Sequence, residues 1–268
     1  MSFDEGLESQ IARSEKLWLF LDYDGTLAGF APTPDDILID QELIDLLSRL
    51  VSSPRLRLAV VSGRRLSHVR ELLPVPGLFL AGAYGIEIQL PNGEQIQRMD
   101  LASIRPVLES IKPGWQKLIA GRQGFYLEDK GWSLALHARF ATDEDAGRVL
   151  SAARSLAEEH LRLGAAMEIM HLLGGHKFLE VSPRAADKGH AVEFLLERFP
   201  FPGALSVMVG DDDKDELAFE RINAYGGISI VVSPVPRPSH AHFRLASPLK
   251  VRRCLESIIH LNNEGPAF

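Results

Sequence analysis

Residues 17–27, Leu17-Trp18-Leu19-Phe20-Leu21-Asp22-Tyr23-Asp24-Gly25-Thr26-Leu27, begin as an apolar run and end in two aspartates one residue apart. Such a run is typical of a strand buried on both faces of a parallel sheet. Strand alternation places Asp22 and Asp24 on the same side, at the strand end where α/β sheets carry their sites. Paired carboxylates repel unless they share a cation or a proton. The stretch therefore predicts a site for a hard ion such as Mg²⁺ beside a nucleophilic carboxylate, although an ordinary Asp-Gly turn would give the same dipeptide.

The composition is that of a globular chain with an acidic balance. Of 268 residues, 46% are hydrophobic and 24% are charged, which allows a sizeable core. The formal net charge of -7 and the lack of a long basic run argue against a nucleic-acid binder. Residues 2–16 lack the apolar segment of a signal peptide, and no apolar run approaches the ~20 residues of a membrane span. With Cys254 as the single cysteine, we expect a soluble cytoplasmic monomer that does not bind membranes.

The first third of the chain alternates strand and helix patterns. Residues 56–61 form a second apolar run, which ends in Ser62-Gly63-Arg64. A helical pattern that Asp40 can cap lies between the two runs, a second helix follows Arg64, and a third short strand lies at 78–81. Strands that alternate with helices pair in parallel through right-handed crossovers. We therefore expect an α/β fold built on a doubly wound parallel sheet.

A different pattern interrupts this alternation. Residues 86–90 and 94–99 alternate apolar and polar positions around Pro91-Asn92-Gly93, which predicts a hairpin. The next segment, to about residue 183, reads as an inserted α+β module. Its expected elements are helices at 104–111 and 142–161 and strands at 124–127, 132–140, 167–172 and 177–181, the last two joined by Gly174-Gly175.

The parallel pattern then resumes. A helix is expected at 188–199 and a buried strand at 205–209, which ends in Gly210-Asp211-Asp212-Asp213-Lys214-Asp215-Glu216. Further along, a strand at 227–232 and a helix at 247–261 complete the chain. Acidic groups at the start of a helix can simply complement its dipole, but so many adjacent carboxylates are costly without a cation. This acidic run therefore favours a metal site.

The polar clusters supply the parts needed for phosphoryl transfer, because loops after parallel strands gather at one sheet edge. Asp22 would attack phosphorus and form an aspartyl phosphate, while Asp24 would serve as acid and then as base. Ser62, Arg64 and Lys188 would hold the phosphate oxygens. Taken singly, Ser62 could be a helix cap and Lys188 a surface lysine, so their joint occurrence carries the prediction. The acidic residues expected to hold Mg²⁺ are Asp22, Asp24, Asp211, Asp212 and Asp215.

The motifs Asp22-Tyr23-Asp24-Gly25-Thr26, Ser62-Gly63-Arg64, Lys188-Gly189 and Gly210-Asp211-Asp212 resemble those of the haloacid dehalogenase superfamily of phosphatases. More narrowly, the chain is similar to trehalose-6-phosphate phosphatases over nearly its whole length. The resemblance implies a Rossmann-like core of residues 1–102 and 185–268, with an α+β cap at 103–184 that selects the substrate. It also implies Mg²⁺ dependence and hydrolysis of trehalose 6-phosphate to trehalose and phosphate.

In that family the cap holds the sugar ring farther from the phosphate. The matching positions here are Glu128, Lys130 and Glu180, with His137, Arg139 and Lys177 as further candidates. Sugar hydroxyls need paired donors and acceptors, which these side chains provide. Without the resemblance, residues 128–130 would read as an exposed hairpin tip and His137 as a packed strand residue.

The chain departs from the family pattern at three places. Ala83-Tyr84 stands where Asn-His or Ser-His is usual before Gly85, and Lys214 replaces the usual Thr before Asp215. The register of Lys177 after Gly175-His176 is ambiguous by one residue. These changes leave the catalytic motifs intact but could alter the substrate.

Three alternatives remain open from the sequence. The first is a phosphatase for another sugar phosphate, such as sucrose 6-phosphate, glucosyl- or mannosyl-phosphoglycerate or a hexose phosphate. The second is a non-catalytic regulatory partner of a synthase, which the intact motifs argue against; a functional link to a trehalose-6-phosphate synthase is expected in either case. The third is a phosphomutase, which the large cap disfavours.

Overall fold

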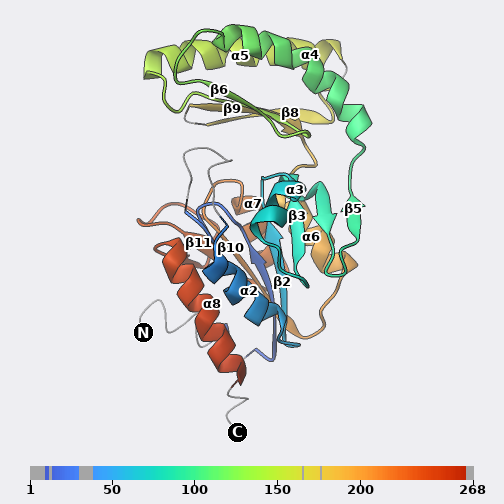
Figure 1. The fold of residues 1–268 in the computed structure, drawn as a ribbon, viewed down its shortest axis with the longest axis vertical. Helices are drawn as coiled ribbons and strands as arrows, with labels where there is room; N and C mark the ends of the chain where they lie inside the picture. The colour runs from blue at the N-terminus through green and yellow to red at the C-terminus, as the bar shows by residue number, and fades with distance from the viewer. Residues whose placement is uncertain (1–9, 12–13, 30–38, 165, 176, 264–268) are drawn as a thin grey trace. The chain divides into compact units, whose positions relative to one another are not determined.

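The computed structural model describes residues 10–11, 14–29, 39–164, 166–175 and 177–263. Residues 2–9 and 12–13, which belong to the segment that we expect not to be a signal peptide, lie outside the described residues, as does His176. The chain divides into two compact units. The first contains Met1–Arg98 and Asp187–Phe268, and the second contains Met99–Ala186. Figure 1 shows an open sheet flanked by helices in the first unit and a smaller sheet with two helices in the second.

The larger unit is built on an eight-stranded sheet with the order β12-β11-β10-β1-β2-β3-β4-β5. The strands from β12 to β3 are parallel, and β4 and β5 add an antiparallel hairpin at one edge. This arrangement confirms the α/β class. The strands are β1 (Lys16–Leu21), β2 (Leu56–Val61), β3 (Phe79–Gly82), β4 (Glu87–Gln89), β5 (Gln95–Gln97), β10 (Ala204–Gly210), β11 (Ile228–Val232) and β12 (Phe243–Leu245).

Helices cover both faces of this sheet. Leu17, Leu19 and Leu21 of β1 belong to the core beneath one set of helices, whereas Trp18 and Phe20 belong to the core on the opposite face. Side chains alternate along a strand, so an apolar residue at every position requires cover on both sides. The first face carries α2 (Gln41–Val51), α3 (Leu66–Leu72) and α8 (Pro248–Asn263), and the second carries α6 (Lys188–Arg198) and α7 (Glu216–Ala224).

The strand order brings the polar loops together. Strands β10, β1 and β2 are parallel neighbours, so their carboxyl ends lie side by side. The ladder continues one residue beyond β1, where the Asp22 N–H donates to the Val209 carbonyl at 2.9 Å. Beyond β2, the Ser62 N–H donates to the Ala81 carbonyl at 2.8 Å. These bonds fix the first residue of each loop at one edge of the sheet.

The second unit is a four-stranded antiparallel sheet with the order β6-β7-β9-β8, and two helices pack on one face (Figure 1). The Trp115 indole N–H donates to the Ala153 carbonyl at 2.9 Å and joins the two buried helix faces. Among the described residues, no helix is both long and apolar enough to cross a bilayer. The elements are α4 (Leu101–Ile119), α5 (Asp143–Leu163), β6 (Tyr126–Asp129), β7 (Leu134–His137), β8 (Met170–Gly175) and β9 (Phe178–Pro183).

Some expected boundaries in this unit were wrong. Helix α4 extends well beyond the predicted 104–111 and contains Pro106 and Pro113, because a buried apolar face, ending in Trp115, outweighs the backbone bonds that proline removes. Gly174-Gly175 pairs with β9 rather than forming the turn. The turn instead includes Lys177, which has a left-handed φ of 54°. Strand β7 is shorter than the predicted 132–140. In the larger unit, β12 was not predicted because three residues give little periodicity.

Candidate active site

Asp22 lies at the carboxyl end of β1 and is only 4% exposed. Its Oδ1 accepts a hydrogen bond from Lys188 Nζ at 2.7 Å. Burial raises the pKa of Asp22 to about 7, because Lys188 offsets the desolvation only in part and Asp211 adds repulsion. The side chain is thus a buried carboxylate held by a cation at a sheet edge, which is the placement expected for a nucleophile.

Lys188 is the first residue of α6 and connects two carboxylates. Asp187 caps this helix by accepting from the His190 N–H at 2.9 Å, which fixes the start of α6. The buried Lys188 ammonium donates to Asp22 Oδ1 and, at 2.6 Å, to Asp215 Oδ1. Burial alone would lower the pKa of Lys188, but Asp215 and Asp22 outweigh it and raise the pKa well above the usual value. Lys188 therefore stays charged.

Asp215 positions the acidic loop. It is fully buried, and its Oδ2 accepts from the Asp211 and Asp212 backbone N–H groups at 3.0 and 3.1 Å. Burial raises its pKa, with Lys188 opposing the shift. Since its two oxygens already bind Lys188 and the loop backbone, Asp215 supports the neighbouring groups as well as contributing charge.

Asp22, Asp211 and Asp215 form the group of described side chains that suits a metal ion. One oxygen of each lies within 4.8 Å of the others. Burial also raises the pKa of Asp211 to about 7, with Asp212 and Asp215 adding repulsion. One lysine against three carboxylates leaves excess negative charge, and an all-oxygen donor set fits Mg²⁺. Asp24 and Asp212, which the sequence also suggested as ligands, do not belong to this group.

Asp24 pairs instead with Arg64. The guanidinium donates to Asp24 through Nε and Nη2, each at 2.7 Å, and Nη1 lies 3.1 Å from His68 Nδ1. Ser62 is fully buried, and its hydroxyl oxygen accepts from the Arg64 backbone N–H at 3.1 Å. Through the Asp24–Arg64 pair, the loop after β2 is joined to the loop after β1.

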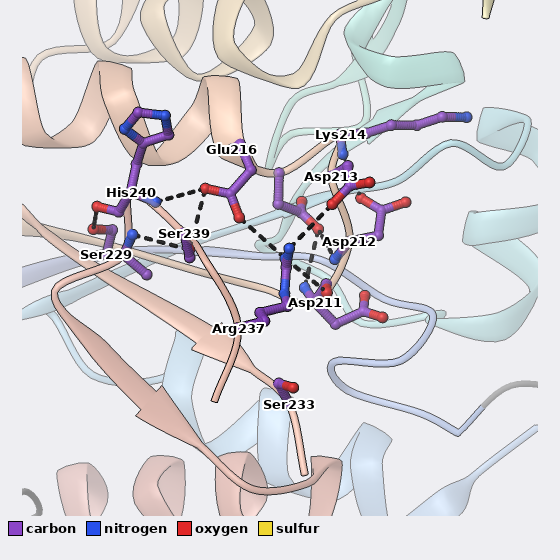
Figure 2. A network of polar contacts seen from close by, with 12 residues as sticks. Asp211, Asp212, Asp213, Lys214, Glu216, Ser229, Ser233, Arg237, Ser239 and His240 are labelled. Carbon is purple, nitrogen blue, oxygen red and sulfur yellow. Dashed lines mark hydrogen bonds and ion pairs between the residues drawn. The ribbon is translucent and has the colours of Figure 1, made fainter. Parts of the chain in front are cut away.

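Arg237, which the sequence analysis missed, holds the acidic loop from its outer side. Figure 2 shows its guanidinium between Glu216 and residues 211–213. It contacts the Asp211 carbonyl at 3.1 Å, Asp213 Oδ1 at 3.0 Å and Glu216 Oε1 at 3.1 Å. Arg237 follows β11, so the rule that loops after parallel strands form sites could have indicated it.

Four of the six sequence-predicted sugar contacts, Glu128, Lys130, His137 and Glu180, gather on the sheet face of the second unit that its helices leave uncovered. Glu128 Oε2 lies 3.1 Å from His137 Nε2. The fully buried Glu180 accepts from Ser133 Oγ at 2.6 Å and from Lys130 Nζ at 3.2 Å. Register places Glu128 level with Glu180 across the intervening strand β7. Carboxylates and a lysine on one face offer the acceptors and donors that a sugar requires.

Other predicted contacts lie elsewhere in this unit. Lys177 Nζ donates to the Ala141 carbonyl at 2.7 Å and pairs with Asp143 at 2.8 Å, so it holds the start of α5. Arg139 is exposed, beyond the end of β7. Asp129, between two predicted sugar contacts, faces the opposite side and binds Arg105 and Lys112 of α4, each at 2.8 Å. Strand alternation alone separates Asp129 from its neighbours.

Comparison with known proteins places the chain in a family. The family model for trehalose-phosphatase matches residues 20–249. The chain belongs to the trehalose-phosphatase family. A relative from Sinorhizobium fredii, named "Probable trehalose-phosphate phosphatase", is 32% identical over 244 residues, which cover 91% of this chain and 88% of the relative.

Solved structures agree with the trehalose-phosphatase fold. The C-terminal domain of the C. albicans trehalose-6-phosphate phosphatase has a TM-score of 0.78 at 20% identity and covers 97% of both chains. The C-terminal domain of the Candida albicans trehalose synthase regulatory protein has a TM-score of 0.72 at 15% identity, over 96% of this chain and 97% of that one. The family and the α/β fold expected from the motifs are thus confirmed.

Proposed function

We propose that the protein hydrolyses trehalose 6-phosphate to trehalose and phosphate. The observation that carries the proposal is the buried Lys188 ammonium, which binds Asp22 and Asp215 at one sheet edge. A nucleophilic carboxylate, a cation and a group of three carboxylates that suits a metal ion are the parts of a covalent phosphatase site, and all lie at that edge. Family membership supports the substrate, since the matching family model is that of trehalose-phosphatase and the Sinorhizobium fredii relative is named a probable trehalose-phosphate phosphatase.

In the proposed mechanism Asp22 attacks phosphorus in line. A bond forms between its carboxylate oxygen and phosphorus while the bond from phosphorus to the sugar oxygen breaks, which gives an aspartyl phosphate. The protonated Asp24 donates its proton to the departing sugar oxygen. Asp24 then takes a proton from water as that water attacks phosphorus, which releases phosphate and restores Asp22. Lys188 and Ser62 hold the phosphate oxygens throughout.

Arg64 has two partners in this scheme. Its guanidinium occupies both carboxylate oxygens of Asp24, at 2.7 Å each. For Asp24 to exchange a proton with the sugar oxygen or with water, one of these oxygens must be free, so Arg64 must move to the phosphate oxygens, which offer the same two-point geometry. Arg64 therefore alternates between Asp24 and the phosphate.

The metal group is proposed to hold Mg²⁺ through Asp22 and Asp211, with Asp215 supporting both the loop and Lys188. Bound Mg²⁺ would neutralise charge that otherwise repels a phosphate dianion from the carboxylates. Burial raises the pKa values of Asp22 and Asp211, and repulsion from neighbouring carboxylates adds to the effect, so a bound cation would favour the charged form of both groups.

We assign sugar recognition to the second unit. Glu128, Lys130, His137 and Glu180 share the sheet face that the helices of this unit leave uncovered. We propose that residues 103–184 are the cap domain that selects the substrate and that residues 1–102 and 185–268 are the catalytic core. Arg139 and Lys177 remain candidates, although Lys177 contacts the start of α5. We further propose a cytoplasmic monomer with a functional link to a trehalose-6-phosphate synthase.

A substrate panel tests this function. Phosphate release is measured with trehalose 6-phosphate, sucrose 6-phosphate, glucosylphosphoglycerate and glucose 6-phosphate, with and without Mg²⁺. We expect kcat/KM for trehalose 6-phosphate to exceed the others by at least about tenfold, because a site built around sugar hydroxyls rejects analogues that leave its polar groups unpaired. Equal turnover of all four esters would refute the disaccharide assignment.

The regulatory alternative keeps one supporting observation. The Candida albicans regulatory protein shares this fold, although at 15% identity the likeness shows the fold alone. A regulatory subunit would not release phosphate from any ester. Detectable Mg²⁺-dependent turnover of trehalose 6-phosphate by the purified chain would exclude this alternative.

A further inference from the structure

Two departures from the family pattern contact each other. Lys214 lies in the acidic loop after β10, and Tyr84 lies just beyond β3. The Lys214 ammonium donates a hydrogen bond to the Tyr84 hydroxyl and also lies 4.5 Å from the centre of the Tyr84 ring. These two contacts, one with a hydroxyl and one with an aromatic face, restrict the position of the Lys214 ammonium.

Tyr84 is in turn fixed on the loop that follows β2. Its backbone N–H donates to the Ser62 carbonyl at 2.9 Å, and the Ala83 N–H donates to the Arg64 carbonyl at 2.6 Å. The Tyr84 ring packs so closely on Gly63 that a Cβ there would lie 2.5 Å from a ring atom. The Tyr84 side chain, which contacts Lys214, is therefore held by backbone hydrogen bonds and ring packing against residues 62–64.

The backbone at this position is strained. Ala83 and Tyr84 have left-handed φ angles of 48° and 55°, which cost free energy for residues other than glycine. Such a conformation persists where surrounding contacts determine it, and the bonds to Ser62 and Arg64 supply those contacts. The strained turn directs the Tyr84 ring, which is 8% exposed, across Gly63 toward Lys214.

Lys214 approaches from the metal-binding side. Its backbone N–H donates to Asp212 Oδ1 at 2.9 Å, which keeps it within the turn of the acidic loop. Figure 2 shows its side chain leaving the Arg237 network in a different direction. The ammonium therefore contacts the Tyr84 side chain, whose ring packs on Gly63 between the proposed phosphate ligands Ser62 and Arg64.

We propose that Lys214 is an additional anion-binding residue for the phosphate group, and that Tyr84 is the positioning residue that holds its ammonium at the rim. The inference deepens the proposed phosphatase function and rests on it. Lys188 supplies a buried cation bound to Asp22, and Lys214 supplies a second cation that Tyr84 holds near the loop after β2. A site with both cations favours dianionic phosphate over monoanionic diesters.

Calorimetric binding of inorganic phosphate at saturating Mg²⁺ tests the pair directly. Lys214→Met should weaken phosphate binding roughly fivefold, the effect of one cation near a partly exposed dianion. Lys214→Arg keeps the charge and should bind within twofold of the wild type. Tyr84→Phe keeps the ring and should weaken binding about twofold, but it should have no effect when Lys214 is already methionine.

Mg²⁺ binding, measured separately, distinguishes this role from general damage to the fold. Loss of the Lys214 cation beside acidic groups should leave Mg²⁺ affinity unchanged or slightly higher. A disrupted loop would instead lower the affinity for both Mg²⁺ and phosphate. The proposal is overturned by unchanged phosphate affinity in Lys214→Met, by a parallel loss of Mg²⁺ affinity, or by a Tyr84→Phe effect that persists without Lys214. Failure of the proposed substrate would instead appear in the wild-type ester panel, which the phosphate titration does not use.

Discussion

Arg64 binds both carboxylate oxygens of Asp24, with Nε–Oδ2 and Nη2–Oδ1 distances of 2.7 Å. The arginine is 10% exposed and the aspartate 28% exposed, so the pair is partly shielded from water. Two parallel bonds of this kind require a planar guanidinium, and lysine cannot reproduce them. The loops after β1 and β2 are therefore joined through the two residues that we propose to handle the proton and the phosphate.

Arg64→Lys should lower kcat/KM for trehalose 6-phosphate by about tenfold, and Arg64→Met by a further factor of about ten, because the first keeps the charge and the second removes it. Steady-state kinetics would measure both. Arg65→Met is the matched control, since this exposed neighbour should leave the rate within twofold. Equal values of kcat/KM for Arg64→Met and the wild type would refute the proposed role of Arg64 in the active site.

Asp22→Asn should abolish Mg²⁺-dependent hydrolysis, with a loss of at least about a thousandfold, because an amide cannot form the aspartyl phosphate. The substitution preserves shape, so circular dichroism and thermal unfolding should show a folded protein. Phosphate release, normalised to folded protein, is the measurement. Survival of the Mg²⁺-dependent rate in this variant would contradict covalent catalysis by Asp22.

Arg237→Met should weaken Mg²⁺ binding about three- to tenfold, because the Asp211 carbonyl and the Asp213 carboxylate lose a shared donor and the acidic loop becomes less ordered. The half-saturating Mg²⁺ concentration is the measurement, supported by calorimetric titration of the metal. Arg253→Met removes an exposed arginine from α8 and serves as the matched control. An unchanged Mg²⁺ response would show that Arg237 does not position the loop.

Asp129→Asn should destabilise the second unit by about 1 kcal/mol at pH 7. Burial opposes ionisation of Asp129, but the hydrogen bonds from Arg105 and Lys112 outweigh it and hold the pKa of this carboxyl well below its usual range. A lowered folded-state pKa means that the stabilisation is complete above the unfolded value of about 3.9 and is lost as the pH falls below it.

Urea unfolding at several pH values measures this difference. The gap in unfolding free energy between wild type and Asp129→Asn should be constant from pH 5 to 8 and should shrink below about pH 4, where Asp129 of the unfolded wild-type chain begins to be protonated while the folded carboxylate stays ionised. Glu159→Gln, on the exposed side of α5, is the control and should show no such gap. A gap that widens toward low pH would reverse the predicted sign.

Short-range signals explain why much of the core fold could be predicted. The alternate faces of β1, the cap of α2 by Asp40 and the hairpin around Pro91-Asn92-Gly93 all depend on neighbouring residues. The order of strand and helix patterns then implied a parallel sheet, and the sheet implied that Asp22 and Lys188 would meet. The sequence therefore predicted both the family and the position of the proposed catalytic edge.

Only the tertiary structure decided which predicted groups bind one another. It paired Asp24 with Arg64, turned Asp129 toward α4 and away from Glu128, and joined Tyr84 to Lys214 across 130 positions of the chain. It also placed Arg237 against the acidic loop. Periodicity and motifs report the local preference of the backbone, whereas these contacts depend on the packing of strands distant in sequence. The sequence thus determined the fold and its chemical class, and long-range packing determined which side chain each charge contacts.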